Sequence, residues 1–85
     1  MATTKRTRRN PKNTRLFSSY GFDTETQYFE YIVDSVINGQ RTQAKELFCK
    51  LNDEQARRFL SQMTVARVWD AYLSDSDKQM FIEIF

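Results

Sequence analysis

Residues 29–39 read FEYIVDSVING and decide the class of fold. Apolar side chains stand at positions 29, 32, 33, 36 and 37, which is the spacing of a helix with one buried stripe. Asn38 and Gly39 follow, and glycine readily takes the left-handed conformation that ends a helix. Upstream, Thr24 and Gln27 have the spacing of a capping box. The sequence therefore predicts an amphipathic helix from about residue 23 to residue 38.

The same helical spacing recurs downstream and predicts further short helices. Apolar residues follow it over residues 44–51 and 56–63, with a stop and a cap at Asn52 and Asp53 between the two segments. Two more stripes cover residues 65–73 and 80–85, and no stretch has the two-residue alternation of a strand. We therefore expect an all-α fold, a compact bundle of four or five short helices, one of them over residues 65–73.

The first fifteen residues, MATTKRTRRNPKNTR, differ from the rest of the chain in charge. They hold six basic residues and no acidic one, whereas residues 16–85 hold seven Lys or Arg against eleven Asp or Glu, a balance of −4. Apart from Met1 the segment has no large apolar side chain that could offset the entropy cost of ordering it. We expect a basic, intrinsically flexible N-terminal arm over residues 1–15, an aromatic connector over residues 16–22 and a helical domain over residues 23–85.

A segment of this charge predicts an anionic partner. Lysine and arginine contact phosphates in a way that is strong at low salt and largely blind to base sequence, which makes nucleic acid the first candidate. An acidic protein surface, including another copy of this protein's own body, is the second candidate. A solvated tail without a partner and a targeting signal are the other interpretations. The candidate binding residues are Lys5, Arg6, Arg8, Arg9, Lys12 and Arg15.

Aromatic residues are more numerous than a body of this size needs for its core. The chain has seven Phe, four Tyr and one Trp. Some of them lie off the main helical stripe or at the C-terminus, where helices fray. Exposed aromatic residues mark protein interfaces, and a small chain often gains stability through assembly, so a protein partner or self-association is one interpretation. Packing on the chain's own core is the other, and we favour it for the C-terminal residues. The candidate interface residues are Tyr28, Tyr31, Phe81 and Phe85.

Several classes of function lack the residues they need. The chain has no histidine, one cysteine (Cys49) and no glycine-rich phosphate loop. We therefore expect no enzyme activity, no metal site and no cofactor. No apolar run approaches the roughly 18 residues of a membrane helix, so no membrane partner is expected. A lone cysteine cannot form an internal disulfide, which favours a reducing, intracellular location.

The stretch EYIVDSVINGQRTQAKELFCKLN, residues 30–52, resembles short helical proteins of crAss-like and other Bacteroidetes phages and mobile elements. The shared features are an apolar helix, the turn Asn38-Gly39-Gln40 and a second helix of the form T-Q-x-x-E-L-F. The resemblance implies a small phage-type binding protein that acts in the host cytoplasm or is carried in a virion. We expect the arm to contact nucleic acid or an acidic protein surface while the helical body contacts protein. The alternative is a structural or packaged virion component in which the arm threads between neighbouring subunits.

Overall fold

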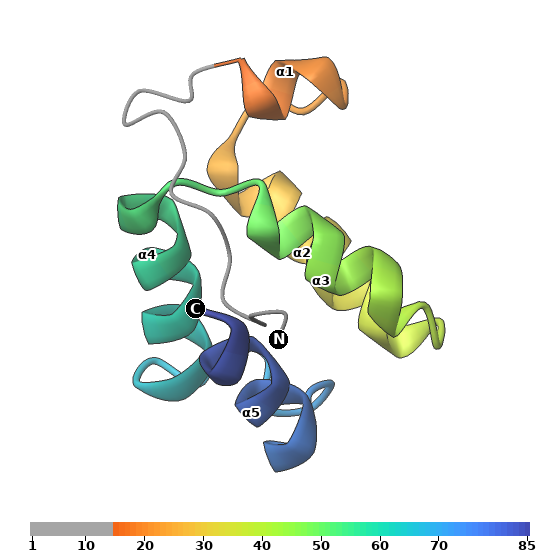
Figure 1. Ribbon diagram of the computed structural model, residues 1–85, viewed down its shortest axis with the longest axis vertical. Coiled ribbons are helices and arrows are strands. Elements are labelled where there is room, and N and C mark those ends of the chain that lie inside the picture. Colours follow the sequence, from red (N-terminus) through yellow and green to blue (C-terminus); the bar gives the residue numbers. More distant parts are fainter. Residues whose placement is uncertain (1–14) are drawn as a thin grey trace, which may run out of the picture.

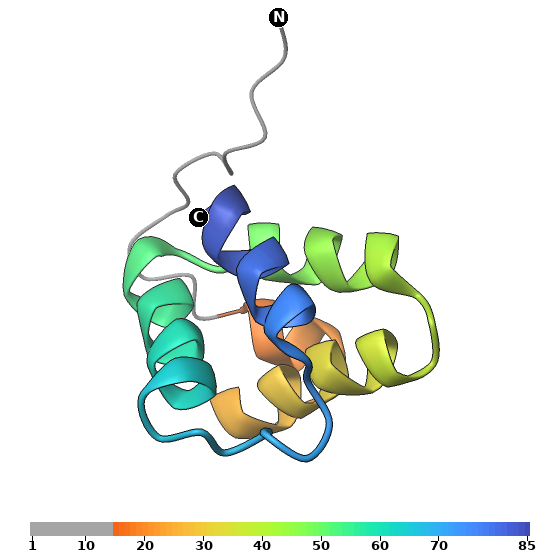
Figure 2. The same cartoon turned by 90° about the horizontal axis from the view of Figure 1, so that it is seen from below.

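The structure is a computed structural model that describes residues 15–85, and these residues form five α-helices and no strand (Figures 1 and 2). The helices are α1 (Leu16–Ser19), α2 (Glu25–Ile37), α3 (Arg41–Cys49), α4 (Asp53–Thr64) and α5 (Asp75–Ile84). α2 and α3 lie side by side and run in opposite directions, while α5 packs against both α3 and α4. The predicted all-α fold is confirmed for this part of the chain.

Side chains cap the N-termini of α2, α4 and α5. The Thr24 hydroxyl accepts a hydrogen bond from the Gln27 amide at 3.2 Å, and the Gln27 side chain accepts one from the Thr24 amide. Asn52 and Gln55 form the same reciprocal pair at the start of α4, and Ser74 forms one with the side chain three residues later in α5. Each box satisfies amide groups that have no partner within the helix, so these boundaries are local properties of the sequence.

Gly39 ends α2 as predicted. Its φ of 80° is left-handed, and the Gln40 amide donates to the Ser35 carbonyl at 2.8 Å while the Gly39 amide donates to the Val36 carbonyl. This is the bonding of a Schellman motif, which satisfies carbonyl groups at the helix end. The tight turn directs α3 back along α2 (Figure 1), and the buried residues of both helices belong to one core.

The core is centred on the ring of Phe59, which is fully buried on α4. Its centroid lies 5.2 Å from that of Phe29 on α2, 5.7 Å from Phe48 on α3 and 5.2 Å from Phe81 on α5. Trp69, from the segment between α4 and α5, lies 5.3 Å away. These separations suit favourable aromatic pairs, so one ring joins four separate parts of the chain.

A second group of aromatic rings fixes the connector to α2. Phe17 lies 5.3 Å from Tyr28, Tyr20 lies 6.0 Å from Tyr31, and Phe22 lies 5.5 Å from Tyr31, all between ring centroids. The connector was predicted without a helix, but its first four residues form α1. Much of the aromatic excess is therefore used within the chain, to hold residues 16–22 against α2.

The helix predicted over residues 65–73 is wrong. This segment, which we name the α4–α5 connection (residues 65–74), has turns in place of a helix, and Arg67 has a left-handed φ of 57°. Only Trp69 and Leu73 are buried, whereas Val65, Val68 and Tyr72 are exposed. β-branched valines have low helix propensity, and two of the five apolar positions suffice to anchor the segment to the core.

Candidate functional site

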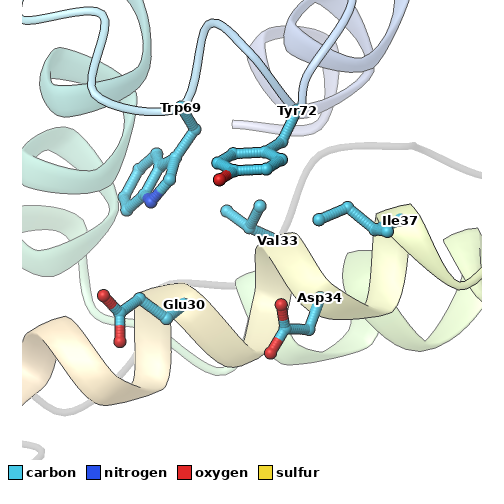
Figure 3. A pocket seen from close by; sticks show the side chains of 6 residues that line it. All are labelled: Glu30, Val33, Asp34, Ile37, Trp69 and Tyr72. Atoms are coloured by element: carbon cyan, nitrogen blue, oxygen red, sulfur yellow. The ribbon is translucent and has the colours of Figure 1, made fainter.

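A groove lies between α2 and the α4–α5 connection (Figure 3). It has a volume of about 310 Å³. We name it the α2 groove. The residues that line it are Glu30, Val33, Asp34, Ile37, Trp69 and Tyr72.

Two carboxylates and two aromatic rings line the α2 groove. Glu30 and Asp34 lie one helical turn apart on the exposed side of α2, while Trp69 and Tyr72 descend from the α4–α5 connection above them (Figure 3). Trp69 is 6% exposed and Tyr72 is 61% exposed, so the tyrosine ring is the accessible one. Like charges one turn apart disfavour the helix slightly, and a bound cation would relieve that repulsion.

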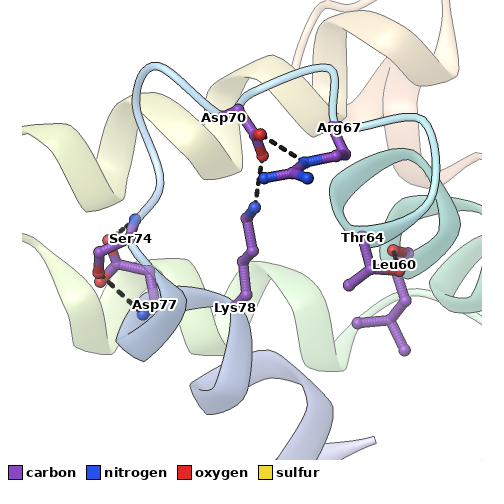
Figure 4. A network of polar contacts seen from close by, with 7 residues as sticks. All are labelled: Leu60, Thr64, Arg67, Asp70, Ser74, Asp77 and Lys78. Atoms are coloured by element: carbon purple, nitrogen blue, oxygen red, sulfur yellow. Dashed lines mark hydrogen bonds and ion pairs between the residues drawn. The ribbon is translucent and has the colours of Figure 1, made fainter.

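Ion pairs brace the α4–α5 connection and join it to α5 (Figure 4). Asp70 accepts a hydrogen bond from Arg67 Nε at 2.6 Å and another from Lys78 Nζ on α5. The bond from Lys78 and then those from Arg67 lower the pKa of the Asp70 carboxyl below its ordinary value. Since Trp69 and Tyr72 flank Asp70 in the sequence, this network positions the wall of the α2 groove.

A second hollow adjoins the α2 groove along α2. Its volume is about 240 Å³, and it shares both Glu30 and Asp34 with the groove. Phe22 and Tyr31 line its other side, so the hollow leads from the connector to the groove. The two carboxylates therefore form an acidic ridge with an aromatic-lined depression on each side.

Most basic residues of the helical body are held in its own ion pairs. Residues 16–85 contain seven Lys or Arg, and four of them pair with carboxylates of the described part of the chain. Arg58 binds Glu25 through two bonds of 2.8 and 2.7 Å, and the bond with Glu25 raises the pKa of the Arg58 guanidinium. Arg41 bonds Asp77, which links the starts of α3 and α5. Little positive charge is left on this surface for an anionic partner.

The predicted arm residues fall almost entirely outside the described residues. Lys5, Arg6, Arg8, Arg9 and Lys12 belong to residues 1–14, of which the structure gives no description. Arg15 is exposed at the start of α1, and its carbonyl accepts a bond from the Ser19 amide. The binding role of all six residues stays a prediction.

The predicted interface residues fall into two pairs. Tyr28 and Phe81 are fully buried, and the Tyr28 hydroxyl donates to the Leu47 carbonyl at 2.6 Å. Their assignment to an interface needs correction, because a side chain without exposed surface cannot contact a partner of the folded chain. Tyr31 and Phe85 are half-buried, and Arg57 lies over the Phe85 ring. Sequence spacing alone missed Tyr72 and Ile37, which are exposed beside the acidic ridge.

Other features of the described surface include a hollow on α4 and the thiol of Cys49. A shallow hollow of about 610 Å³ on α4 is larger than the α2 groove, but Asp53, Glu54, Arg57, Arg58 and Ser61 line it, all from one helix. Within residues 15–85 no group of three or more Cys, Asp or Glu side chains could hold a metal ion. Cys49 is half-buried against the core. The helices of this part of the chain are too short or too polar to cross a bilayer.

Comparison with known proteins gives no family model, no curated protein and no solved structure that matches the chain.

Proposed function

We propose that the protein is a small, non-enzymatic binding protein of phage type. Its basic arm, residues 1–15, contacts nucleic-acid phosphates, and its helical body contacts protein. The observation that carries the proposal is the separation of charge along the chain. The arm has six cations and no acid, whereas the body has a balance of −4 and holds four of its seven cations in ion pairs. Such a body repels a polyanion, which makes the arm the part suited to bind it.

The expected binding mode is contact with the backbone and not with the bases. Each arginine or lysine that neutralises a phosphate releases condensed counterions, so affinity falls steeply as salt rises. Six such contacts on duplex DNA give a slope of log affinity against log salt of about −5. Phosphate contacts carry no sequence information, and the acidic helical body has few cations to direct at base edges.

Exposed apolar side chains support the protein-contact role of the body. Ile37, Val65, Val68 and Tyr72 each expose more than half of their surface. Three of them belong to the α4–α5 connection, and Ile37 faces that connection across the α2 groove. Apolar side chains that gather on one surface are typical of protein interfaces.

The test is a binding titration of the full chain against duplex DNA and single-stranded RNA, from low to physiological salt. The arm variant replaces Lys5, Arg6, Arg8, Arg9, Lys12 and Arg15 with Gln. A control variant, Lys45→Gln with Arg57→Gln, removes charge from exposed positions on the body. We expect the parent and the control to bind with a steep salt slope and the arm variant to lose binding. Parent protein that fails to bind either polymer at low salt refutes the nucleic-acid role.

Sedimentation of the same samples separates the two versions of the function. A binding protein sediments as a monomer or dimer, alone and in its complex. A structural virion component assembles in many copies, and its arm variant loses that assembly.

A further inference from the structure

We infer that the α2 groove is a docking site for the basic arm of the same chain. The inference deepens and rests on the proposed function, because it gives the arm a second anionic surface that competes with nucleic acid. It adds a named site on the helical body, made by Glu30 and Asp34 with the rings of Tyr72 and Trp69.

The first argument is chemical complementarity. No ion pair joins Glu30 or Asp34 to a cation within residues 15–85, whereas Glu25, Glu54, Asp70 and Asp77 are paired there. Their oxygens can each accept bonds from a guanidinium, and the exposed ring of Tyr72 in the same groove offers a cation–π contact. Arginine is the residue that combines both modes of contact, and the arm contains four arginines and two lysines.

The second argument is reach. Arg15 is the first described residue, and the connector that follows it packs on α2 through Phe22 and Tyr31. The hollow beside Phe22 contains Glu30 and Asp34, so the acidic ridge borders the connector that leads to the arm. Fourteen residues span up to about 46 Å when extended, and the longest dimension of the molecule is 36 Å.

The third argument selects the arm of the same chain over that of a second copy. A tethered segment that can reach its site has an effective concentration in the millimolar range. A second copy at micromolar concentration competes poorly with it. Because exposed ion pairs are weak, only the tethered arm has a concentration high enough to occupy the groove measurably.

Trp69 makes the proposal directly measurable. It is the single tryptophan of the chain and it lines the groove, so one indole N–H signal in the NMR spectrum reports on this site. A nitroxide attached at Thr7→Cys, in a Cys49→Ala background, broadens signals that it approaches. The groove variant carries Glu30→Gln and Asp34→Asn. The matched control carries Glu46→Gln and Glu83→Gln, two exposed carboxylates on α3 and α5 outside the groove.

We expect the nitroxide to broaden the Trp69 signal in the parent and in the matched control, and several-fold less in the groove variant. High salt or added duplex DNA should restore the sharp signal. Equal broadening in the parent and the groove variant overturns the proposal. In a mixture of isotope-labelled chain without nitroxide and unlabelled chain with nitroxide, we expect a sharp signal. Broadening there assigns the groove to a second copy and overturns the same-chain proposal.

The two proposals fail separately in these experiments. If the parent binds DNA in a salt-dependent way but its Trp69 signal is no broader than that of the groove variant, the proposed function is supported and the docking site is refuted. If the Trp69 signal is broader in the parent than in the groove variant but the parent does not bind nucleic acid, the docking site is supported and the proposed function is refuted.

Discussion

Phe59→Ala tests whether one buried ring holds the helical body together. Phe59 is fully buried, and its four ring partners come from α2, α3, α5 and the α4–α5 connection. Replacing a buried Phe with Ala lowers the free energy of unfolding by about 3–5 kcal/mol. The loss is largest where the neighbouring side chains cannot move in to fill the cavity. Because the four partners belong to four separate elements, they cannot all move into the cavity. We therefore expect the free energy of unfolding to fall by about 4–5 kcal/mol. Typical stability for the 71 described residues is about 4–11 kcal/mol.

Urea denaturation followed by far-ultraviolet circular dichroism measures this loss. Trp69 fluorescence is a poor signal here, because the substituted ring lies next to the indole. Phe85→Ala is the control, because it removes the same side chain from a half-buried position at the C-terminus. We expect it to lower the free energy of unfolding by less than half as much as Phe59→Ala. A Phe59→Ala protein within about 1 kcal/mol of the parent would refute the central role of this ring, because changes of that size are ordinary at sites without a special role.

Three further predictions concern the helix ends and the α4–α5 connection. Gly39→Ala should lower the free energy of unfolding by about 1–2 kcal/mol, since an added Cβ meets no atom within 4 Å and the cost comes from φ alone; Gly39→Asn should lose less in the same urea titration. Thr24→Ala should cost about 1 kcal/mol through loss of the α2 cap. Because the folded pKa of Asp70 lies below its unfolded value, its stabilising contribution is present above the unfolded pKa and is lost as pH falls through the folded one. Denaturation below about pH 4 should therefore show a flatter decline for Asp70→Asn than for the parent.

Local signals in the sequence predicted the helices whose ends are set by adjacent residues. The capping boxes at Thr24 and Asn52 and the left-handed Gly39 depend on contacts within a few positions, and all three are present in the structure. The part of the fold that depends on contacts between distant residues was less predictable from the sequence. Residues 65–73 have helical spacing, but Arg67 turns left-handed, and only tertiary packing decides that Trp69 and Leu73 are the residues buried.

The candidate site depends on that same long-range packing. Tyr28 was considered an interface residue because it lies off the main stripe of α2, yet α1 and the end of α3 cover it. The α2 groove needs Trp69 and Tyr72 to lie beside Glu30 and Asp34, residues 35 or more positions earlier in the chain. No spacing rule brings such residues together, so the charge of the arm was predictable while the acidic site that complements it was not.

The α2 groove and nucleic acid compete for the same basic arm, and the largest effect of docking on DNA affinity can be calculated. Exposed ion pairs contribute up to about 1 kcal/mol each, so two carboxylates stabilise the docked arm by about 2 kcal/mol at most. Glu30→Gln with Asp34→Asn should therefore raise the affinity of the full chain for duplex DNA by no more than about 30-fold at low salt. The gain should shrink towards physiological salt, because screening weakens the docked state as well. A gain well above this limit would mean that the groove does more than hold two cations, and an unchanged affinity would mean that the arm does not occupy it.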